Sequence, residues 1–577
     1  MTPDPAATLP VNQSIDSATR LTLLAAGACA VASWLMPTHE LPWPAFHAEL
    51  AMALAALLGS VGVLWALRGR MGNIPVLAIV VSVVAMTPLL QLLTGTVRFV
   101  GDAILSSLYL FGFAAMIVVG HHAARLWSGR RVLEACAWTV LLASIASSGM
   151  ALAQWQLPDE LPLFVNQLVP LSRPYANLSQ PNLLASLLVL GLLSIACLFD
   201  NGRIGAMVGL STAWLLSFGL ILAQSRAAWL ELLIIAAMAI CKRRGLTGRL
   251  RLRHFAVGAL LLLLAQLGWM HLDPLSGQSV ARDAVSSATS TGVRITHWQE
   301  MVAALLQRPW MGYGWMGVVS AQYTVAAGFP PTQEILAYSH NLVLDLLIWT
   351  GIPAGLVITF WLSAWMWRVA RNAAEPSAVL ALAALLAMVV HAQVEYPLAY
   401  TYFLLPAGVL CGLLSAGAAN SSVRTVPAWL SPLLLSGATA VLAVVSADYL
   451  AFEQQLRLLR MDQARIGLGA PREAIAPIRL LTQLDAMLRF GRTPERENMS
   501  ADQLDEMRAT VARFPSGPNL IRLAAALAMN HRPDEAKSVL QLVCKLEPEW
   551  MCQGMEGLWT ALGARQQAIQ RVAWPPS

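Results

Sequence analysis

Long apolar runs recur along the first three quarters of this 577-residue chain, and they constrain its fold more than any other feature. Each run is close to 20 residues long, enough to cross the roughly 30 Å hydrocarbon core of a bilayer as a helix. Only 12% of the residues are charged, so a soluble fold could not bury so many apolar runs. The chain lacks the short alternating segments of a transmembrane barrel, and it is therefore predicted to be an all-α polytopic transmembrane bundle.

Thirteen runs qualify as spans, within a range of eleven to thirteen. The first follows a polar start that contains proline, so it is interpreted as a span and not as a cleavable signal. The predicted spans are 21–37, 49–67, 74–93, 103–120, 134–153, 182–199, 206–223, 227–240, 255–272, 342–364, 377–394, 401–417 and 427–446.

Basic residues follow the even-numbered spans, and loops rich in Lys and Arg face the cytoplasm. The amino terminus is therefore predicted to be cytoplasmic and the carboxyl tail to lie outside. This placement also accounts for the net charge of +6 without a nucleic-acid partner. The residues are Arg68, Arg70, Arg125, Arg130, Arg131, Lys242, Arg243, Arg244, Arg249, Arg251, Arg253, Arg368 and Arg371.

The same count places four informative segments outside: 38–48, 154–181, the large loop 273–341 and the turn 395–400. A functional site is expected where these segments meet. The chain divides into a transmembrane domain, 1–446, and a tail, 447–577, that holds close to half of the charged residues. The tail has helical apolar spacing, and its stretch PDEAKSVLQLVCKLEP resembles the second helix of a tetratricopeptide unit.

Seven cysteines are present, and five lie in or beside spans without metal-ligand spacing. Cys544 and Cys552 lie in the hydrophilic tail instead. On the outside of the membrane they can form a disulfide, and the alternative is a pair of free thiols.

The first polar cluster on the predicted outer side is SRPYANLSQPNLLA, which leads into the span 182–199. Arg173 offers a planar guanidinium suited to phosphate oxygens. Asn177, Gln180 and Asn182 can donate to sugar or pyrophosphate oxygens, and Pro181 marks a helix start whose free N–H groups favour anions. The alternative is an ordinary polar loop before a capped helix.

Further polar residues stand at the outer ends of other spans. Arg226 in AQSRAAWL lies between two apolar runs and requires an anionic partner, unless it extends to the interface. In the large loop, Arg294, His297 and Glu300 are three residues apart and would share one face of a helix, which Pro309, Gly312 and Gly314 then end.

The sequence SHN brings His340 and Asn341 to the start of the span 342–364, with Asp345 one turn deeper. A neutral imidazole can accept a proton from an attacking hydroxyl near pH 7, although an interfacial histidine can also serve only as a hydrogen-bonding group. Glu395 and Tyr396 stand in the turn between two later spans.

Together these side chains suit a polyprenyl-pyrophosphate sugar, because arginines can neutralise the leaving pyrophosphate while a base or hydrogen-bonding group orients the nucleophile. The chain has no Asp-rich magnesium motif. A metal-independent reaction without a cofactor is therefore expected.

The motifs ANLSQPNLLA, QSRAAW, SHNLVLDLL and VEYPLAY, with the Arg294 loop and PTHELPWPAFHAE, resemble the Wzy/WaaL superfamily of O-antigen ligases and polymerases. Within it, the chain is similar to PglL-type bacterial protein O-oligosaccharyltransferases over nearly its whole length. The resemblance implies an inner-membrane enzyme that transfers a preassembled glycan from undecaprenyl pyrophosphate to Ser or Thr of periplasmic proteins such as pilins. It also implies a periplasmic helical tail.

By motif, the resemblance implies that His340, Gln180 and Tyr396 are catalytic and that Arg226, Arg294 and Arg173 grip the pyrophosphate. Asn177, Asn182, Asn341 and Glu395 are expected to contact the donor as well.

Two other readings stay open. A relative with another acceptor would be a lipid A–core ligase or a glycan polymerase, and a polymerase would not need a helical tail. A transporter would spread polar residues through the midplane of several spans, whereas here they collect at one face.

Overall fold

The computed structural model describes residues 15–67, 72–158, 160–168, 172–272, 292–417, 423–466 and 476–575. The predicted helical class is confirmed, since helices account for nearly all of the regular structure within these ranges. Arg68, Arg70 and the first part of the large loop, 273–291, lie outside the described residues. The chain forms two compact units, each discontinuous in sequence.

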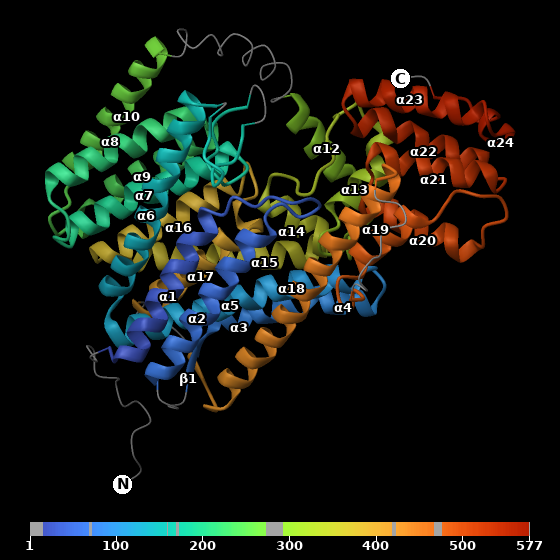
Figure 1. The fold of residues 1–577 in the computed structure, drawn as a ribbon. Helices are drawn as coiled ribbons and strands as arrows, with labels where there is room; N and C mark the ends of the chain where they lie inside the picture. Colours follow the sequence, from blue (N-terminus) through green and yellow to red (C-terminus); the bar gives the residue numbers. More distant parts are fainter. Residues whose placement is uncertain are drawn as a thin grey trace. The chain divides into compact units, whose positions relative to one another are not determined.

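The first unit comprises residues up to 84, 109–286 and 361–439. Its central helix is α7, Pro181–Asp200. In the most apolar 18-residue stretch of this helix, 78% of the residues are buried. This helix packs against α6, α8, α9 and α16 (Figure 1). The helices that lie wholly in this unit are α1 Ser17–Trp34, α2 Phe46–Leu67, α6 Gly129–Gln156, α7, α8 Ala206–Ala223, α9 Arg226–Cys241, α10 Leu252–Leu272, α16 Pro376–His391 and α17 Thr401–Gly417.

The second unit comprises residues 85–108, 287–360 and 440–577. It contains α4 Thr87–Leu93, α12 Gly292–Gln307, α13 Val318–Val325 and α14 Leu342–Thr350. Four stacked helices follow in the carboxyl-terminal part (Figure 1). They are α20 Ala501–Arg513, α21 Gly517–Met529, α22 Pro533–Leu546 and α23 Glu549–Gly563, flanked by α19 Thr482–Arg492 and α24 Gln567–Gln570.

The carboxyl-terminal helices share their core with the large loop. Ala326 is buried among their apolar side chains, and Tyr323 and Ile335 pack against the same core. Backbone N–H groups of Thr332 and Gln333 donate to the carbonyl oxygen of Lys545 at 3.0 and 2.9 Å. Cys544 and Cys552, at the junction of α22 and α23, are joined by a disulfide.

Nine helices in the described residues are long and apolar enough to cross a membrane. The other four predicted spans also form helices. Of these, α1 and α9 do not combine the length and hydropathy of these nine helices, and α16 and α17 are shorter apolar helices. Four helices run through both units: α3 Val76–Ala85, α5 Val100–Trp127, α15 Ile352–Asn372 and α18 Leu430–Gln463.

The predicted span 342–364 is interrupted in the structure, where α14 ends and α15 begins around Gly351. Gly351 has a φ of 81°, and a Cβ there would lie 2.3 Å from the carbonyl oxygen of Trp310. The backbone N–H of Tyr313 donates to Ile348 at 2.7 Å, and that of Ile352 donates to Pro309 at 2.7 Å. The helix breaks because the segment RPWMGYG, residues 308–314, packs against it. At Gly351 only glycine fits, since a side chain would collide with this segment.

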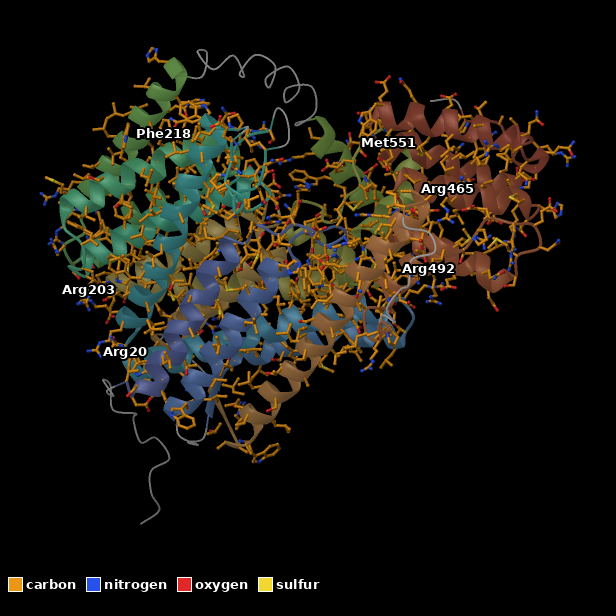
Figure 2. All side chains as sticks on the ribbon, in the orientation of Figure 1. Arg20, Arg203, Phe218, Arg465, Arg492 and Met551 are labelled. Atoms are coloured by element: carbon orange, nitrogen blue, oxygen red, sulfur yellow. A yellow bond between two sulfur atoms is a disulfide. The ribbon has the colours of Figure 1, made fainter. Side chains whose placement is uncertain are left out.

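Polar loops that are predicted to be cytoplasmic contact one another within the first unit. Arg130 donates to Asn201 at 2.7 Å, the N–H of Leu250 donates to Asp200 at 2.8 Å, and Lys242 donates to the Arg371 carbonyl at 3.3 Å. The strands β1, Gly72–Pro75, and β2, Val423–Val426, pair antiparallel, from Gly72 opposite Val426 to Pro75 opposite Val423. Figure 2 shows Arg20 and Arg203 toward the same end of this unit. The loops that follow even-numbered predicted spans therefore contact one another, and their cytoplasmic placement stays a prediction.

Candidate functional site

Two predicted motifs meet at one turn of the first unit. Gln180 precedes α7, and its Nε2 donates to the phenol oxygen of Tyr396 at 2.7 Å. Two residues further on, Nδ2 of Asn182 donates to Oε1 of Glu395 at 2.9 Å. The amides of SQPN are thus fixed by the EYP turn, and the carboxylate and phenol are fixed in return.

The loop before α7 is held by internal hydrogen bonds. Asn177 is buried, and its Nδ2 donates to the carbonyl oxygens of Leu35 and Phe164, both at 2.8 Å, while its Oδ1 accepts from the N–H of Asn166. These bonds use both N–H groups of the Asn177 amide and its oxygen. Asn177 therefore positions the loop and does not present a free donor.

The segment 38–48 joins the same loop, as expected, through His39. Nε2 of His39 lies 3.0 Å from the carbonyl oxygen of Asn177, and Nδ1 lies 2.7 Å from the Ser179 hydroxyl. Burial lowers the pKa of His39, although hydrogen bonds to backbone carbonyls oppose the shift. A neutral imidazole is therefore part of this loop cluster, although the sequence pattern alone did not indicate His39 as a site residue.

Two of the predicted arginines lie near the turn between α8 and α9. Nη1 of Arg173 donates to the carbonyl oxygen of Gln224 at 2.6 Å, which ties the first motif to QSRAAW. Ser225 caps α9 by accepting the N–H of Ala228 at 3.4 Å, and Arg226 follows as an exposed first residue of the helix. A cation thus stands beside the free N–H groups of a helix start, where an anion is favoured.

In the second unit, the SHN turn is fixed on three sides. The N–H of Ser339 donates to Oδ1 of buried Asp345 at 2.7 Å, and Nε1 of Trp298 donates to the Ser339 carbonyl at 3.0 Å. Asn341 caps α14 by accepting the N–H of Leu344 at 3.0 Å. These bonds present half-buried His340 at the tip of the turn.

The face formed by Arg294, His297 and Glu300 on α12 is packed as the spacing predicts, since His297 and Glu300 are buried. Burial, together with the charges of His340 and Arg294, lowers the pKa of His297 to about 4. Burial raises the pKa of Glu300 to about 7, opposed by a hydrogen bond from Gln322 at 3.2 Å. His297 is therefore a neutral neighbour of the SHN turn near pH 7.

Left-handed backbone recurs in the predicted motifs. Ala176, Ser179, Gln224 and His340 have φ values of 52°, 62°, 46° and 58°. An L-residue rarely adopts this conformation, and such residues concentrate at functional sites. The motifs are therefore unusual in backbone geometry as well as in composition.

A buried polar group beneath the EYP turn was missed from the sequence. The Ser186 hydroxyl lies 2.5 Å from both Oε1 of Glu231 and Nδ1 of His391, and the latter two are 3.2 Å apart. Their exposed fractions are 1%, 0% and 0%. Glu231 and His391 each lie in an apolar helix, and the rule that ionisable residues within spans are functional candidates would have identified both.

Among the described residues, no group of three His, Cys, Asp or Glu side chains is arranged to hold a metal ion. Metal independence remains a prediction. The geometry itself provides two sets of polar side chains, one in each unit, each fixed by neighbours on other elements.

Two family descriptions match the chain. Residues 211–360 match the family described as "O-Antigen ligase", and residues 379–549 match "Virulence factor membrane-bound polymerase, C-terminal". Together these segments cover more than half of the chain.

Two curated relatives come from Acinetobacter baylyi. The first, a "General O-oligosaccharyltransferase", is 28% identical over 526 residues, which cover 89% of this chain and 90% of the relative. The second, a "ComP-specific O-oligosaccharyltransferase", is 26% identical over 335 residues, 58% of this chain and 60% of the relative. No solved structure matches the chain.

Proposed function

Since this chain belongs to the O-antigen ligase superfamily, in its branch of PglL-type O-oligosaccharyltransferases, we propose that it glycosylates exported proteins. It is a glycosyltransferase that moves a preassembled glycan from undecaprenyl pyrophosphate to Ser or Thr, with pilins among its acceptors. The observation that carries the proposal is the pairing of Gln180 with Tyr396, beside that of Asn182 with Glu395.

The transfer needs one new bond and one broken bond. The hydroxyl oxygen of the acceptor Ser or Thr bonds to the anomeric carbon, while the bond from that carbon to pyrophosphate breaks and the pyrophosphate leaves with the electron pair. Arg226, Arg294 and Arg173 neutralise the leaving group, which is the transition-state charge that enzymes commonly stabilise.

His340 accepts the proton of the acceptor hydroxyl or orients that hydroxyl for attack. Its fixed turn supports this role, because the backbone cannot move away without breaking the bonds made by Ser339 and Asn341. Gln180 and Tyr396 hold the sugar or its phosphate through the donors and acceptors of their pair.

We place the enzyme in the inner membrane with thirteen spans in residues 1–446, a cytoplasmic amino terminus and a periplasmic tail, 447–577. The positive-inside rule supports this orientation, and the loops that it assigns to the cytoplasm contact one another through Asn201, Leu250 and Arg371. The loop 273–341 and the turn 395–400 then face the periplasm. We also assign the tail a fold similar to tetratricopeptide repeats.

The test is glycosylation of periplasmic proteins in cells that contain a lipid-linked glycan and either wild type, His340→Ala or no copy of the enzyme. Mass spectrometry looks for the intact glycan on Ser or Thr, and lipopolysaccharide is analysed in parallel. His531→Ala is the matched control, because His531 is an exposed histidine that also has left-handed backbone, with φ of 61°, outside every motif.

Glycan on protein in wild type and His531→Ala, absent in His340→Ala and in the null strain, is the expected result. Unmodified protein with altered lipopolysaccharide would move the acceptor to lipid A–core or to a growing glycan. The polymerase description of residues 379–549 makes that second outcome the alternative to exclude.

A further inference from the structure

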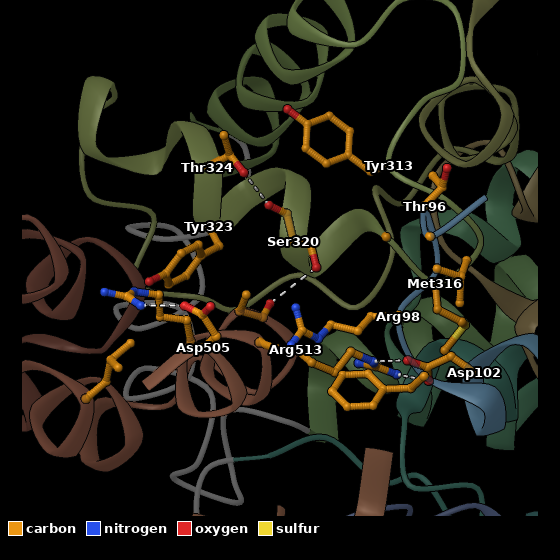
Figure 3. Close-up of a pocket in the computed structure, with 18 of the residues that line it drawn as sticks. Thr96, Arg98, Asp102, Tyr313, Met316, Ser320, Tyr323, Thr324, Asp505 and Arg513 are labelled. Carbon is orange, nitrogen blue, oxygen red and sulfur yellow. Dashed lines mark hydrogen bonds and ion pairs between the residues drawn. The ribbon is translucent and has the colours of Figure 1, made fainter. Parts of the chain in front are cut away.

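A cavity of about 770 Å³ lies in the second unit, between the start of α5, the large loop and the carboxyl-terminal helices (Figure 3). Its size falls in the range of ligand sites, roughly 300–1,000 Å³. None of the predicted catalytic residues lines it. Its lining comes from three segments that the charge pattern places on the periplasmic side: 95–102, 308–324 and 505–539.

The charges of the lining leave two arginines available. Arg513 makes an ion pair with Asp102 at 2.9 Å, and Arg508 bonds Asp505 and Glu535, both at 2.6 Å. Arg98 and Arg308 are exposed and make no ion pair within the part of the chain that the structure describes. The guanidinium of Arg308 lies instead over the Tyr313 ring, 4.7 Å from its centroid.

The rest of the lining is mixed in character. Phe99, Met316 and Leu527 provide apolar surface, and Ser320 and Thr324 provide hydroxyls. These hydroxyls already donate to backbone carbonyls.

Buried Tyr313, with 6% of its surface exposed, has a phenol oxygen that completes no hydrogen bond among the described residues. Burial raises the pKa of Tyr313, opposed by the charge of Arg308 and by the neighbouring Thr324 hydroxyl, which itself donates to the Ser320 carbonyl at 2.8 Å. The Arg308 guanidinium over this ring makes no ion pair among the described residues, so an anionic ligand can gain charge-assisted hydrogen bonds from it.

This cavity is connected to the SHN turn. The phenol of Tyr338 lies 3.8 Å from the sulfur of Met316, which lines the cavity. Trp315 stacks on Trp349 with ring centroids 4.9 Å apart, and Gln91 bonds the backbone of both tryptophans, at 2.9 and 2.7 Å. A ligand in the cavity would therefore lie beside the segment that holds His340.

We propose that the cavity binds an acidic segment of the acceptor polypeptide, with Arg98 and Arg308 donating to its carboxylates. The proposal rests on the proposed function and names its acceptor subsite. A polypeptide suits the lining better than a lipid-linked phosphate does, since Phe99, Met316 and Leu527 offer apolar surface for side chains beside the two arginines. Charge-assisted hydrogen bonds from arginine are the strong contacts in such a site.

The test uses the purified full-length chain, an undecaprenyl-pyrophosphate-linked glycan and two serine-containing peptides. One peptide carries Asp and Glu near the serine. The other has Asn and Gln at the same positions and is otherwise identical. We expect the acidic peptide to have a KM about tenfold lower with wild type, as two charge-assisted bonds allow. The Arg98→Gln/Arg308→Gln variant should reduce this preference to under about twofold with little change in kcat, and added salt should weaken it in wild type.

Arg565→Gln, an exposed arginine elsewhere in the carboxyl-terminal part, is the matched control and should retain the preference. Arg98→Lys/Arg308→Lys should retain part of it, since lysine keeps the charge. A preference that survives in the double glutamine variant, or a variant whose KM rises for the lipid-linked donor alone, would overturn the proposal. Equal transfer to both peptides would overturn the subsite only, whereas no transfer to any peptide or periplasmic protein would overturn the proposed function itself.

Discussion

The amide of Gln180 donates to the phenol oxygen of Tyr396 at 2.7 Å, although 216 positions separate the two residues. If this bond orients both groups for transfer, Gln180→Leu and Tyr396→Phe should each lower kcat at least tenfold. The double variant should be little worse than either single one, because residues in one network are not additive. Tyr400→Phe, the same change four residues along, is the control. Additive losses in the double variant would show that the two side chains act independently.

The buried group of Ser186, Glu231 and His391 should contribute mainly to stability. Glu231→Ala removes one partner of a buried pair, which costs about 3 kcal/mol, while Glu231→Gln keeps an acceptor for the Ser186 hydroxyl and should cost about 1 kcal/mol. Thermal unfolding of the purified protein in detergent measures both. Exposed Glu375→Ala in the same unit should leave the midpoint unchanged. Equal unfolding midpoints for the three variants would contradict a stabilising role.

Glu300 should make the second unit less stable as the pH rises. Its pKa is raised from 4.5 to about 7, so the folded protein retains a proton that the unfolded chain loses. The resulting stability is full below pH 4.5 and is lost as the pH rises through about 7. Glu300→Gln cannot ionise, and its midpoint relative to wild type should increase across that window.

His297 provides the internal check on that result. Its pKa is lowered from 6.5 to about 4, so its contribution is present above pH 6.5 and is lost as the pH falls toward 4. The unfolding midpoint of His297→Gln relative to wild type should therefore rise as the pH falls, whereas that of Glu300→Gln should rise as the pH rises. Parallel profiles for the two variants would mean that neither group titrates as its burial requires.

The disulfide between Cys544 and Cys552 should stabilise the carboxyl-terminal helices by about 2 kcal/mol, as expected for a short closed loop. A reductant should lower the unfolding midpoint of wild type and leave a variant with Cys544→Ser and Cys552→Ser unaffected. Cys241→Ser, at an exposed free cysteine, should respond to reductant as wild type does. If wild type purified from the membrane can be alkylated at both tail cysteines without reductant, the disulfide does not form in the cell.

Apolar runs predicted most helices of this fold to within a few residues, since length and hydropathy alone determine a span. The break at Gly351 could not be predicted in this way. It depends on the distant RPWMGYG segment, and GIPAGL reads as part of a continuous apolar run.

The site was predicted as separate clusters of polar residues at one side of the membrane. The pairing of Asn182 with Glu395 required the structure, because spacing in sequence does not give contacts between spans. Two amides were assigned to the donor from their type alone, yet Asn177 and Asn341 are occupied by a loop and a helix cap. Local hydrogen bonding of this kind is common for asparagine and competes with any role in binding.

Left-handed backbone at Ala176, Ser179, Gln224 and His340 has a consequence for engineering. Each of these residues costs on the order of 1–2 kcal/mol relative to an ordinary conformation, and none is glycine, the residue that would remove the cost. Selection for heat resistance alone should therefore bring glycine to these positions, and at His340 it would remove the side chain that carries the chemistry. Thermostable forms of this enzyme that are also active should owe their gain to other regions, such as the helices around α7.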